Sequence, residues 1–225
     1  MQTKLMAVGL LVLTLIFLST RQNLKADVGP VITMNGGSLM RASVSHDDFA
    51  QSFESQQQTE WCWAASVSNI FAYYGHPVSQ QTIVQTVYGN NGNYPALPIV
   101  ISRVVNRTWK DDNGVEFRSR LISAYDLASG VNNMSNATII DELTNNHPLL
   151  VANTHHCMVI TAVDFIPYTT NIQGVIVFDP WPLSDEVHYL SYPEIIPAYL
   201  YGGQCTYIAA VRLTEADGTE SVHPQ

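Results

Sequence analysis

Hydrophobic residues recur at helical spacing in the first half of the chain. Between residues 62 and 74, large apolar residues return every three or four positions, which predicts a buried helix. A second helix is predicted to follow an N-cap at Ser79 and to end at Gly89, because serine caps helix starts and glycine accepts the backbone conformation that ends them. Two further predicted helices begin at Pro98 and after an N-cap at Ser135.

The pattern changes after residue 148, where β-branched residues become frequent. Short apolar runs of this composition, bounded by polar or turn-forming residues, predict strands. The predicted strands cover residues 149–152, 157–165, 174–178 and 206–213. Helices therefore precede strands, which predicts an α+β fold with an N-terminal helical part and a C-terminal antiparallel β-sheet.

The composition indicates a globular chain rather than a disordered one. Hydrophobic residues make up 46% of the 225 residues and charged residues 13%, so the chain can bury a core. The formal net charge is -9, and the sequence has no cluster of lysine or arginine. This excludes the electrostatic footprint of a nucleic-acid-binding protein.

The first residues predict an export signal. Lys4 provides a positive start, and the uncharged run from Leu5 to Leu18 has the length of a signal-peptide core but is short for a membrane-spanning helix. Ala26 is the best small residue for cleavage. We therefore expect a secreted or periplasmic protein. An uncleaved anchor is the alternative, and only in that case is membrane contact expected.

The sequence divides into four predicted segments. The predicted signal peptide covers residues 1–26, and an arm with two adjacent glycines covers residues 27–49. A single folded domain is predicted over residues 50–213, and residues 214–225 form a polar tail.

The number of cysteines is odd, so at least one thiol of an exported chain is unpaired within it. Cys157 begins one predicted strand and Cys205 precedes another. If these strands are neighbours, the two residues are candidates for a disulfide, which needs Cα atoms within about 7 Å. The alternative is that Cys157 is a small apolar residue in the core.

Cys62 opens the first predicted helix. A helix N-terminus stabilises a thiolate, which is the form of cysteine that attacks an acyl carbon. Gln56 lies far enough upstream to fold back and place its amide beside the sulfur, where a hydrogen-bond donor would stabilise an oxyanion. The alternative for Cys62 is an inert cysteine in the core.

His156 stands at the start of an apolar strand, from which an imidazole can reach a thiol on another element. The alternative is a histidine that bonds to backbone at a strand edge. A metal site made with His155 and Cys157 is disfavoured, because consecutive strand residues point to opposite faces.

Asp179 ends another apolar strand, where its carboxylate can accept a hydrogen bond from the imidazole and fix its tautomer. The alternative is an Asp-Pro turn at the surface. Asp164 lies eight residues after His156 in the same strand, roughly 26 Å away at about 3.3 Å per residue, which is too far to contact the same imidazole. Asp185 and Glu186 fall in a predicted loop, where a carboxylate is solvated.

The order glutamine, cysteine, histidine and aspartate resembles that of the papain-like superfamily. The Cys62-Trp63 step at a helix start and the Asp179-Pro180-Trp181 step carry this resemblance. Compact bacterial branches are more similar, namely the double-glycine leader peptidases and the secreted effector proteases of plant pathogens. The matching stretches are residues 56–66, 156–164 and 175–180, and the resemblance spans about residues 50–212.

The resemblance implies a papain-like cysteine peptidase from a bacterium. Cys62 would attack a peptide bond, and His156 would carry the proton. Asp179 would orient the imidazole, and Gln56 would hold the oxyanion together with the Cys62 backbone N–H. No metal or organic cofactor is needed, and we expect a monomer whose partner is a protein or peptide substrate.

Several alternatives stay open at this point. The glycine that usually precedes the histidine is His155 here, so His155 is an alternative base. Gln57 is an alternative to Gln56 at the oxyanion. An acyltransferase or amidase would use the same residues, and an inactive binding module would use the same fold.

Overall fold

The structure is a computed structural model, and it describes residues 28–32 and 38–222. Within these residues, ten strands form one sheet, in which the order along the main path is β1-β2-β7-β6-β10-β4-β3. Strand β5 pairs with β4, β8 pairs with β7, and β9 pairs with β8. All of these pairs are antiparallel. The predicted signal peptide lies outside the described residues.

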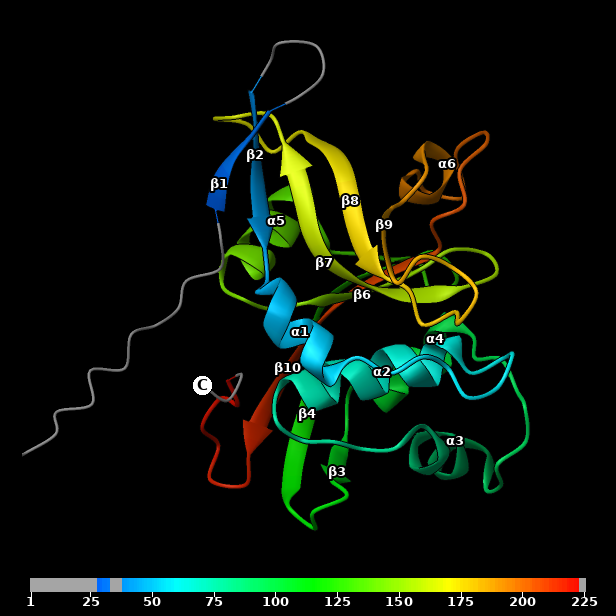
Figure 1. Ribbon diagram of the computed structural model, residues 1–225. Coiled ribbons are helices and arrows are strands. Elements are labelled where there is room, and N and C mark those ends of the chain that lie inside the picture. Colours follow the sequence, from blue (N-terminus) through cyan, green and yellow to red (C-terminus); the bar gives the residue numbers. More distant parts are fainter. Residues whose placement is uncertain (1–27, 33–37, 223–225) are drawn as a thin grey trace, which may run out of the picture.

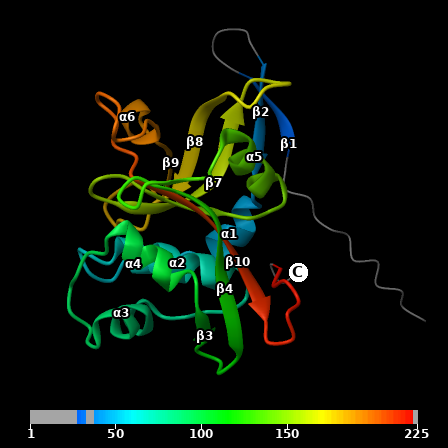
Figure 2. The same ribbon diagram turned by 180° about the vertical axis from the view of Figure 1, so that it is seen from behind.

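The bounds of the strands are β1 Val28–Ile32, β2 Ser38–Ser43, β3 Thr108–Lys110, β4 Glu116–Asp126, β5 Val131–Asn132, β6 Leu149–Ala152, β7 Cys157–Phe165, β8 Ile172–Phe178, β9 Val187–Tyr189 and β10 Tyr207–Glu215. The bounds of the helices are α1 His46–Ser52, α2 Cys62–Tyr73, α3 Gln80–Tyr88, α4 Pro98–Val104, α5 Asn136–Thr144 and α6 Tyr192–Ile195. Helices α1 to α4 gather in the lower half of the molecule, beside the lower parts of β4 and β10 (Figures 1 and 2).

The helix boundaries follow the local signals in the sequence. The Ser79 side chain caps α3, the Ser135 side chain caps α5, and Pro98 occupies the first turn of α4. Gly89 ends α3 with a left-handed φ of 72°. These helix starts and ends are confirmed, because each depends on contacts within one turn of the chain.

Helix α2 is buried on nearly all sides, which explains why its sequence is apolar around most of the helix. It packs against α1, α3 and β7. The Phe71 ring meets the rings of Trp109 and Phe117 in edge-to-face contacts, with centroids 5.7 and 5.2 Å apart. The helix thereby joins the helical part to the sheet through one continuous core.

The predicted α+β class is confirmed, but the sheet uses more of the chain than the sequence indicates. Residues 27–49 were predicted to form an arm. The structure instead places β1, β2 and most of α1 in this segment, and β2 pairs with β7. The long strand β4 was also missed. Exposed and buried residues alternate in its first part, its last three residues are all buried, and it pairs with β10 along most of its length.

The final residues turn back onto the sheet. Strand β10 continues to Glu215, and the Ser221 N–H then donates to the Leu213 carbonyl at 2.9 Å. The His76 imidazole bonds to Glu215 at 2.9 Å and to Asp111 at 3.2 Å. The segment predicted as a polar tail therefore begins as part of the sheet.

The three cysteines are free in the structure. Cys157 begins β7 and Cys205 precedes β10. Strand β6 lies between these two strands, so they are not neighbours. Two strand spacings amount to roughly 10 Å, which is beyond the reach of a disulfide. Cys157 is buried in the core, as the alternative interpretation predicted.

Within residues 28–32 and 38–222, no helix has the length and apolar character that crossing a membrane requires.

Candidate active site

The antiparallel pairing of β7 with β8 brings His156 and Asp179 together. Val159 of β7 lies opposite Phe178 of β8. His156 immediately precedes β7 and Asp179 immediately follows β8, so both residues leave the sheet at the same end. The His156 Nε2 atom lies 2.5 Å from Asp179 Oδ1.

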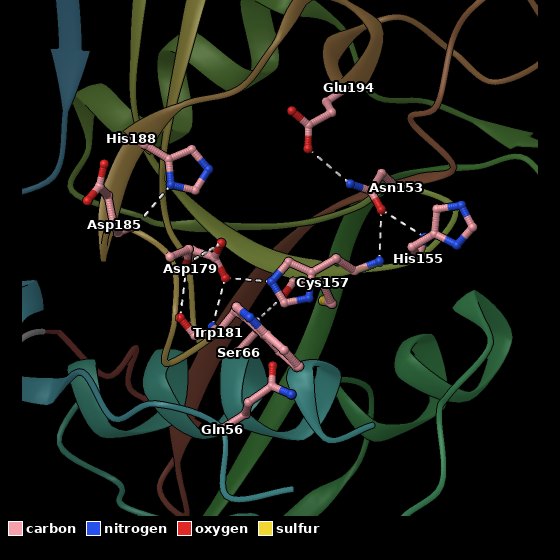
Figure 3. A network of polar contacts seen from close by, with 12 residues as sticks. Gln56, Ser66, Asn153, His155, Cys157, Asp179, Trp181, Asp185, His188 and Glu194 are labelled. Atoms are coloured by element: carbon pink, nitrogen blue, oxygen red, sulfur yellow. Dashed lines mark hydrogen bonds and ion pairs between the residues drawn. The ribbon is translucent and has the colours of Figure 1, made fainter. Parts of the chain in front are cut away.

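Helix α2 is tied to the same end of β7. The Ser66 hydroxyl donates to the Cys157 carbonyl at 3.1 Å. Ser66 lies one helical turn after Cys62, so the two residues share a face of α2. This bond directs that face of the first turn toward the residue next to His156, and Figure 3 shows Ser66 beside Cys157.

The loop before α2 is tied to the loop after β8. The Gln56 backbone N–H donates to the Pro180 carbonyl at 2.8 Å. Gln56 is buried, and Figure 3 shows it near Trp181. The four residues that the sequence singled out, Gln56, Cys62, His156 and Asp179, are therefore assembled at one junction between the helices and the sheet.

Asp179 is held in place by several hydrogen bonds. The Trp181 N–H donates to Oδ1 and the Ser184 hydroxyl donates to Oδ2, each at 2.8 Å. Burial raises the pKa of the Asp179 carboxyl, but the bonds from His156, Trp181 and Ser184 outweigh burial and lower it. The carboxyl is therefore ionised at neutral pH and accepts the imidazole N–H.

The environment of His156 favours its charged form. Burial alone would lower the pKa of the imidazole. The hydrogen bond to Asp179 and the contact with Cys62 act in the opposite direction and raise the pKa of His156 to about 9. Because Nε2 faces Asp179, Nδ1 is the nitrogen that is left for the Cys62 sulfur. The Trp181 ring stands edge-on to the imidazole, with centroids 6.5 Å apart.

The Gln56 amide does not lie as the sequence predicted. Its Nε2 donates to the carbonyls of Gln58 and Thr59 at 2.8 and 2.9 Å. The Oε1 atom is buried and has no hydrogen-bond partner among the described residues. If Oε1 and Nε2 were exchanged, Oε1 would face two carbonyl oxygens and could accept no hydrogen bond from them. The hydrogen bonds therefore favour the orientation in which Nε2 faces the two carbonyls. The amide N–H groups stabilise the loop before Cys62 rather than facing the sulfur.

The alternative residues lie elsewhere. The Gln57 side chain accepts a hydrogen bond from Gln81 of α3, and His155 is exposed. Asp164 pairs with Arg41, with bonds of 2.8 and 3.0 Å, and with the Tyr189 hydroxyl at 2.7 Å. Asp185 is exposed too. In the described part of the chain, no hydrogen bond or ion pair joins any of these side chains to His156.

Two residues that support the site were missed in the sequence. Asn153 accepts the N–H groups of His155 and His156, each at 2.8 Å, and donates to Glu194 of α6 at 3.1 Å (Figure 3). It therefore sets the turn that leads into β7. Ser184 supports the Asp179 carboxylate. The sequence contains a signal for the role of Asn153. An asparagine side chain often accepts the backbone N–H groups two or three residues further along the chain and so forms a turn.

Among the described residues, no group of three or more histidine, cysteine, aspartate or glutamate side chains has an arrangement that could hold a metal ion.

Comparison with known proteins shows the family of the chain. The chain matches the Peptidase_C39-like family over residues 50–205, which is more than half of its length. It belongs to this family, which is part of the papain-like cysteine peptidase clan.

No curated protein matches the chain. Among solved structures, it is similar to the crystal structure of UfSP from C. elegans, with a TM-score of 0.41 and 16% sequence identity. The similarity covers 86% of this chain and 35% of that one. The chain therefore spans about a third of the length of that structure.

We predict that Asp179→Asn lowers the pKa of His156 from about 9 toward or below the usual 6.5, because the charge that stabilises the imidazolium is lost. NMR titration of the histidine ring protons measures this shift. Asp185→Asn is the matched control, since Asp185 is an exposed carboxylate nearby in the sequence. An unchanged titration of His156 in Asp179→Asn would contradict the pairing.

The same pair makes a pH-dependent contribution to stability. The pKa of His156 is higher in the folded state than the ordinary value of 6.5. The stabilisation is therefore fully present below about pH 6.5 and is lost as the pH rises through about 9. Asp179→Asn should remove this dependence from denaturant unfolding curves.

Proposed function

We propose that this cysteine peptidase hydrolyses peptide bonds through Cys62, His156 and Asp179, with a covalent acyl-enzyme intermediate. The observation that carries the proposal is the 2.5 Å bond between His156 and Asp179, formed next to the first turn of the helix that Cys62 opens. A pKa of about 9 keeps His156 protonated at neutral pH. An imidazolium beside a cysteine favours the nucleophilic thiolate.

In the first step, the Cys62 sulfur attacks the carbonyl carbon of the substrate and forms a tetrahedral intermediate. His156 then donates the proton on Nδ1 to the leaving amine as the C–N bond breaks, which leaves a thioester on Cys62. In the second step, His156 takes a proton from water onto Nδ1, and the hydroxide adds to the thioester carbon. The C–S bond then breaks and the acid product leaves, which restores the Cys62 thiolate beside a protonated His156.

Asp179 holds the imidazole through Nε2 and stabilises its positive charge. For the oxyanion, the Cys62 backbone N–H is the donor we propose, because the first N–H groups of a helix have no partner within it. Gln56 can assist only if its amide gives up one of the bonds to Gln58 or Thr59. Otherwise these two bonds hold the loop before α2 in its conformation.

We further propose that the protein is exported, with the apolar run from Leu5 to Leu18 as its signal. The expected result is a secreted protein that begins close to residue 27. N-terminal sequencing and intact-mass measurement of protein recovered from outside the producing cells test this. A membrane-bound product that retains Lys4 would instead support the uncleaved anchor.

Cys62→Ala should abolish peptide hydrolysis while leaving the unfolding transition close to that of the wild type. In the wild-type protein, iodoacetamide should label Cys62 before the other two cysteines. Cys157 and Cys205 are each 2% exposed, and burial raises the pKa of both thiols, that of Cys205 to about 11. Peptide mapping by mass spectrometry measures the order. Faster labelling of Cys157 would rule out Cys62 as the nucleophile.

Asp179→Ala should lower kcat/KM by about 10–100-fold, which corresponds to about 1.4–2.7 kcal/mol. Asp179→Asn should cost less, because asparagine still accepts the imidazole N–H while the charge is lost. The matched control is Asp164→Asn, which alters a buried carboxylate that bonds to Arg41 and not to His156. Full activity of Asp179→Ala, or complete loss in Asp164→Asn, would show that the wrong acid has been assigned.

A further inference from the structure

We propose that Asn153 and Glu194 are positioning residues of the active site, which hold His156 where its imidazole can serve Cys62 and Asp179. This inference rests on the peptidase function proposed above. Among the described residues, neither side chain forms a hydrogen bond with the imidazole, the Cys62 sulfur or the Asp179 carboxylate. Both side chains therefore act on the site through the backbone that carries His156.

His156 belongs to the tight turn that joins β6 to β7. Strand β6 ends at Ala152, β7 begins at Cys157, and these two residues lie opposite each other in the sheet. Residues 153–156 therefore form a four-residue connection, and the imidazole extends from its last residue. Because His156 lies outside the strand pairing, the bonds within the turn decide its direction.

Asn153 binds both backbone groups of His156. The His156 N–H donates to the Asn153 side-chain oxygen at 2.8 Å, and the Asn153 N–H donates to the His156 carbonyl at 3.0 Å. The same side-chain oxygen accepts the His155 N–H at 2.8 Å. An asparagine that accepts N–H groups further along the chain in this way closes a turn. The direction in which the imidazole leaves the backbone therefore depends on Asn153.

Glu194 of α6 fixes the orientation of the Asn153 amide. The amide donates to Glu194 Oε1 at 3.1 Å (Figure 3). With the amide reversed, its NH₂ group would face two N–H groups and its oxygen would face a carboxylate, so the hydrogen bonds favour one orientation. Glu194 is itself held, since its Oε2 accepts the N–H and the hydroxyl of Ser191 at 2.9 and 2.6 Å. The carboxylate thus links the start of α6 to the turn that carries His156.

Thr206 fastens the first residue of the turn from the side of β10. Its N–H donates to the Ala152 carbonyl at 2.9 Å, and its hydroxyl lies 3.1 Å from the carbonyl oxygens of Ala152 and Asn153. Asn153 is therefore held through its backbone by Thr206 and through its side chain by Glu194. Surrounding bonds of this kind can keep a catalytic group within about 0.5 Å of its productive position.

A shift of the turn should affect the chemical steps rather than substrate binding. The imidazole must keep its 2.5 Å bond to Asp179 through Nε2 while Nδ1 faces Cys62. Because a displacement of about 1 Å can cost about 100-fold in rate, loss of the turn bonds should lower kcat. KM should change little, because the two positioning side chains act on His156 and not on the substrate.

An exchange of donor and acceptor between the two residues tests this inference in the full chain. Asn153→Asp keeps an oxygen for the two N–H groups but sets a carboxylate against Glu194. Glu194→Gln sets an amide donor against the Asn153 amide. Each single variant should lower kcat about 10-fold or more and change KM by less than about 3-fold. The double variant Asn153→Asp/Glu194→Gln again pairs one donor with one acceptor and should recover most of the loss.

The pKa of His156 gives a second readout, which a merely structural role would not move. Burial lowers this pKa, but the hydrogen bond to Asp179 and the contact with Cys62 raise it to about 9. A displaced imidazole loses these contacts, so each single variant should lower the pKa toward the ordinary value of 6.5. The double variant should bring it back, and NMR titration of the histidine ring protons measures both changes.

Asn133→Ala is the matched control. The Asn133 side-chain oxygen accepts the Ala124 N–H at 2.6 Å, and the Asn133 N–H donates to the Ala124 carbonyl at 3.0 Å. Asn133 thus makes the same pair of bonds to β4, which β10 and β6 separate from β7. This variant should reduce the free energy of unfolding but leave kcat and the pKa of His156 unchanged.

The outcomes separate this inference from the proposed function. Wild-type kcat in both single variants, no recovery in the double variant, or an equal loss in Asn133→Ala would overturn the positioning role. If the wild type cleaves no peptide, the peptidase mechanism fails. The titration of His156 in the same variants still decides whether Asn153 and Glu194 position the imidazole, since that measurement needs no substrate.

Discussion

The pairing of β7 with β8 is the constraint on which the rest of the site depends. The register places Val159 opposite Phe178, and His156 and Asp179 extend from these strands at the same end. A slip by one residue would turn each side chain to the opposite face of the sheet and separate the imidazole from the carboxylate. Every residue of β7 is buried, so the core of the protein holds this register.

Hydrogen bonds from other elements then complete the junction. Ser66 joins α2 to the start of β7, and the Gln56 backbone joins the loop before α2 to Pro180. Within the junction, the Asp179 carboxylate is buried but fully bonded, which is what allows it to remain charged there. The protonated imidazole is a consequence of the fold as much as of the residue type.

Much of the fold follows from local signals, and the exceptions have a physical cause. The side chains of Ser79 and Ser135 cap their helices within one helical turn. The strand that begins at residue 149 is a continuous run of apolar residues. Strand β4 differs, because Glu116, Arg118 and Arg120 point to solvent between buried residues and interrupt the apolar pattern. Its pairing with β10 joins residues about 90 positions apart, which no local signal reveals.

The sequence by itself determined the chemistry available to this protein: a cysteine at a helix start, histidines before an apolar strand, and an aspartate after another. Only the tertiary structure decided that His156 rather than His155 meets Asp179, and that the Gln56 amide bonds to its own loop. It also placed β6 between the strands next to Cys157 and Cys205. The reason is that residue type and local propensity belong to a short stretch of chain, whereas the direction of a side chain depends on strand register and on partners far away in the sequence.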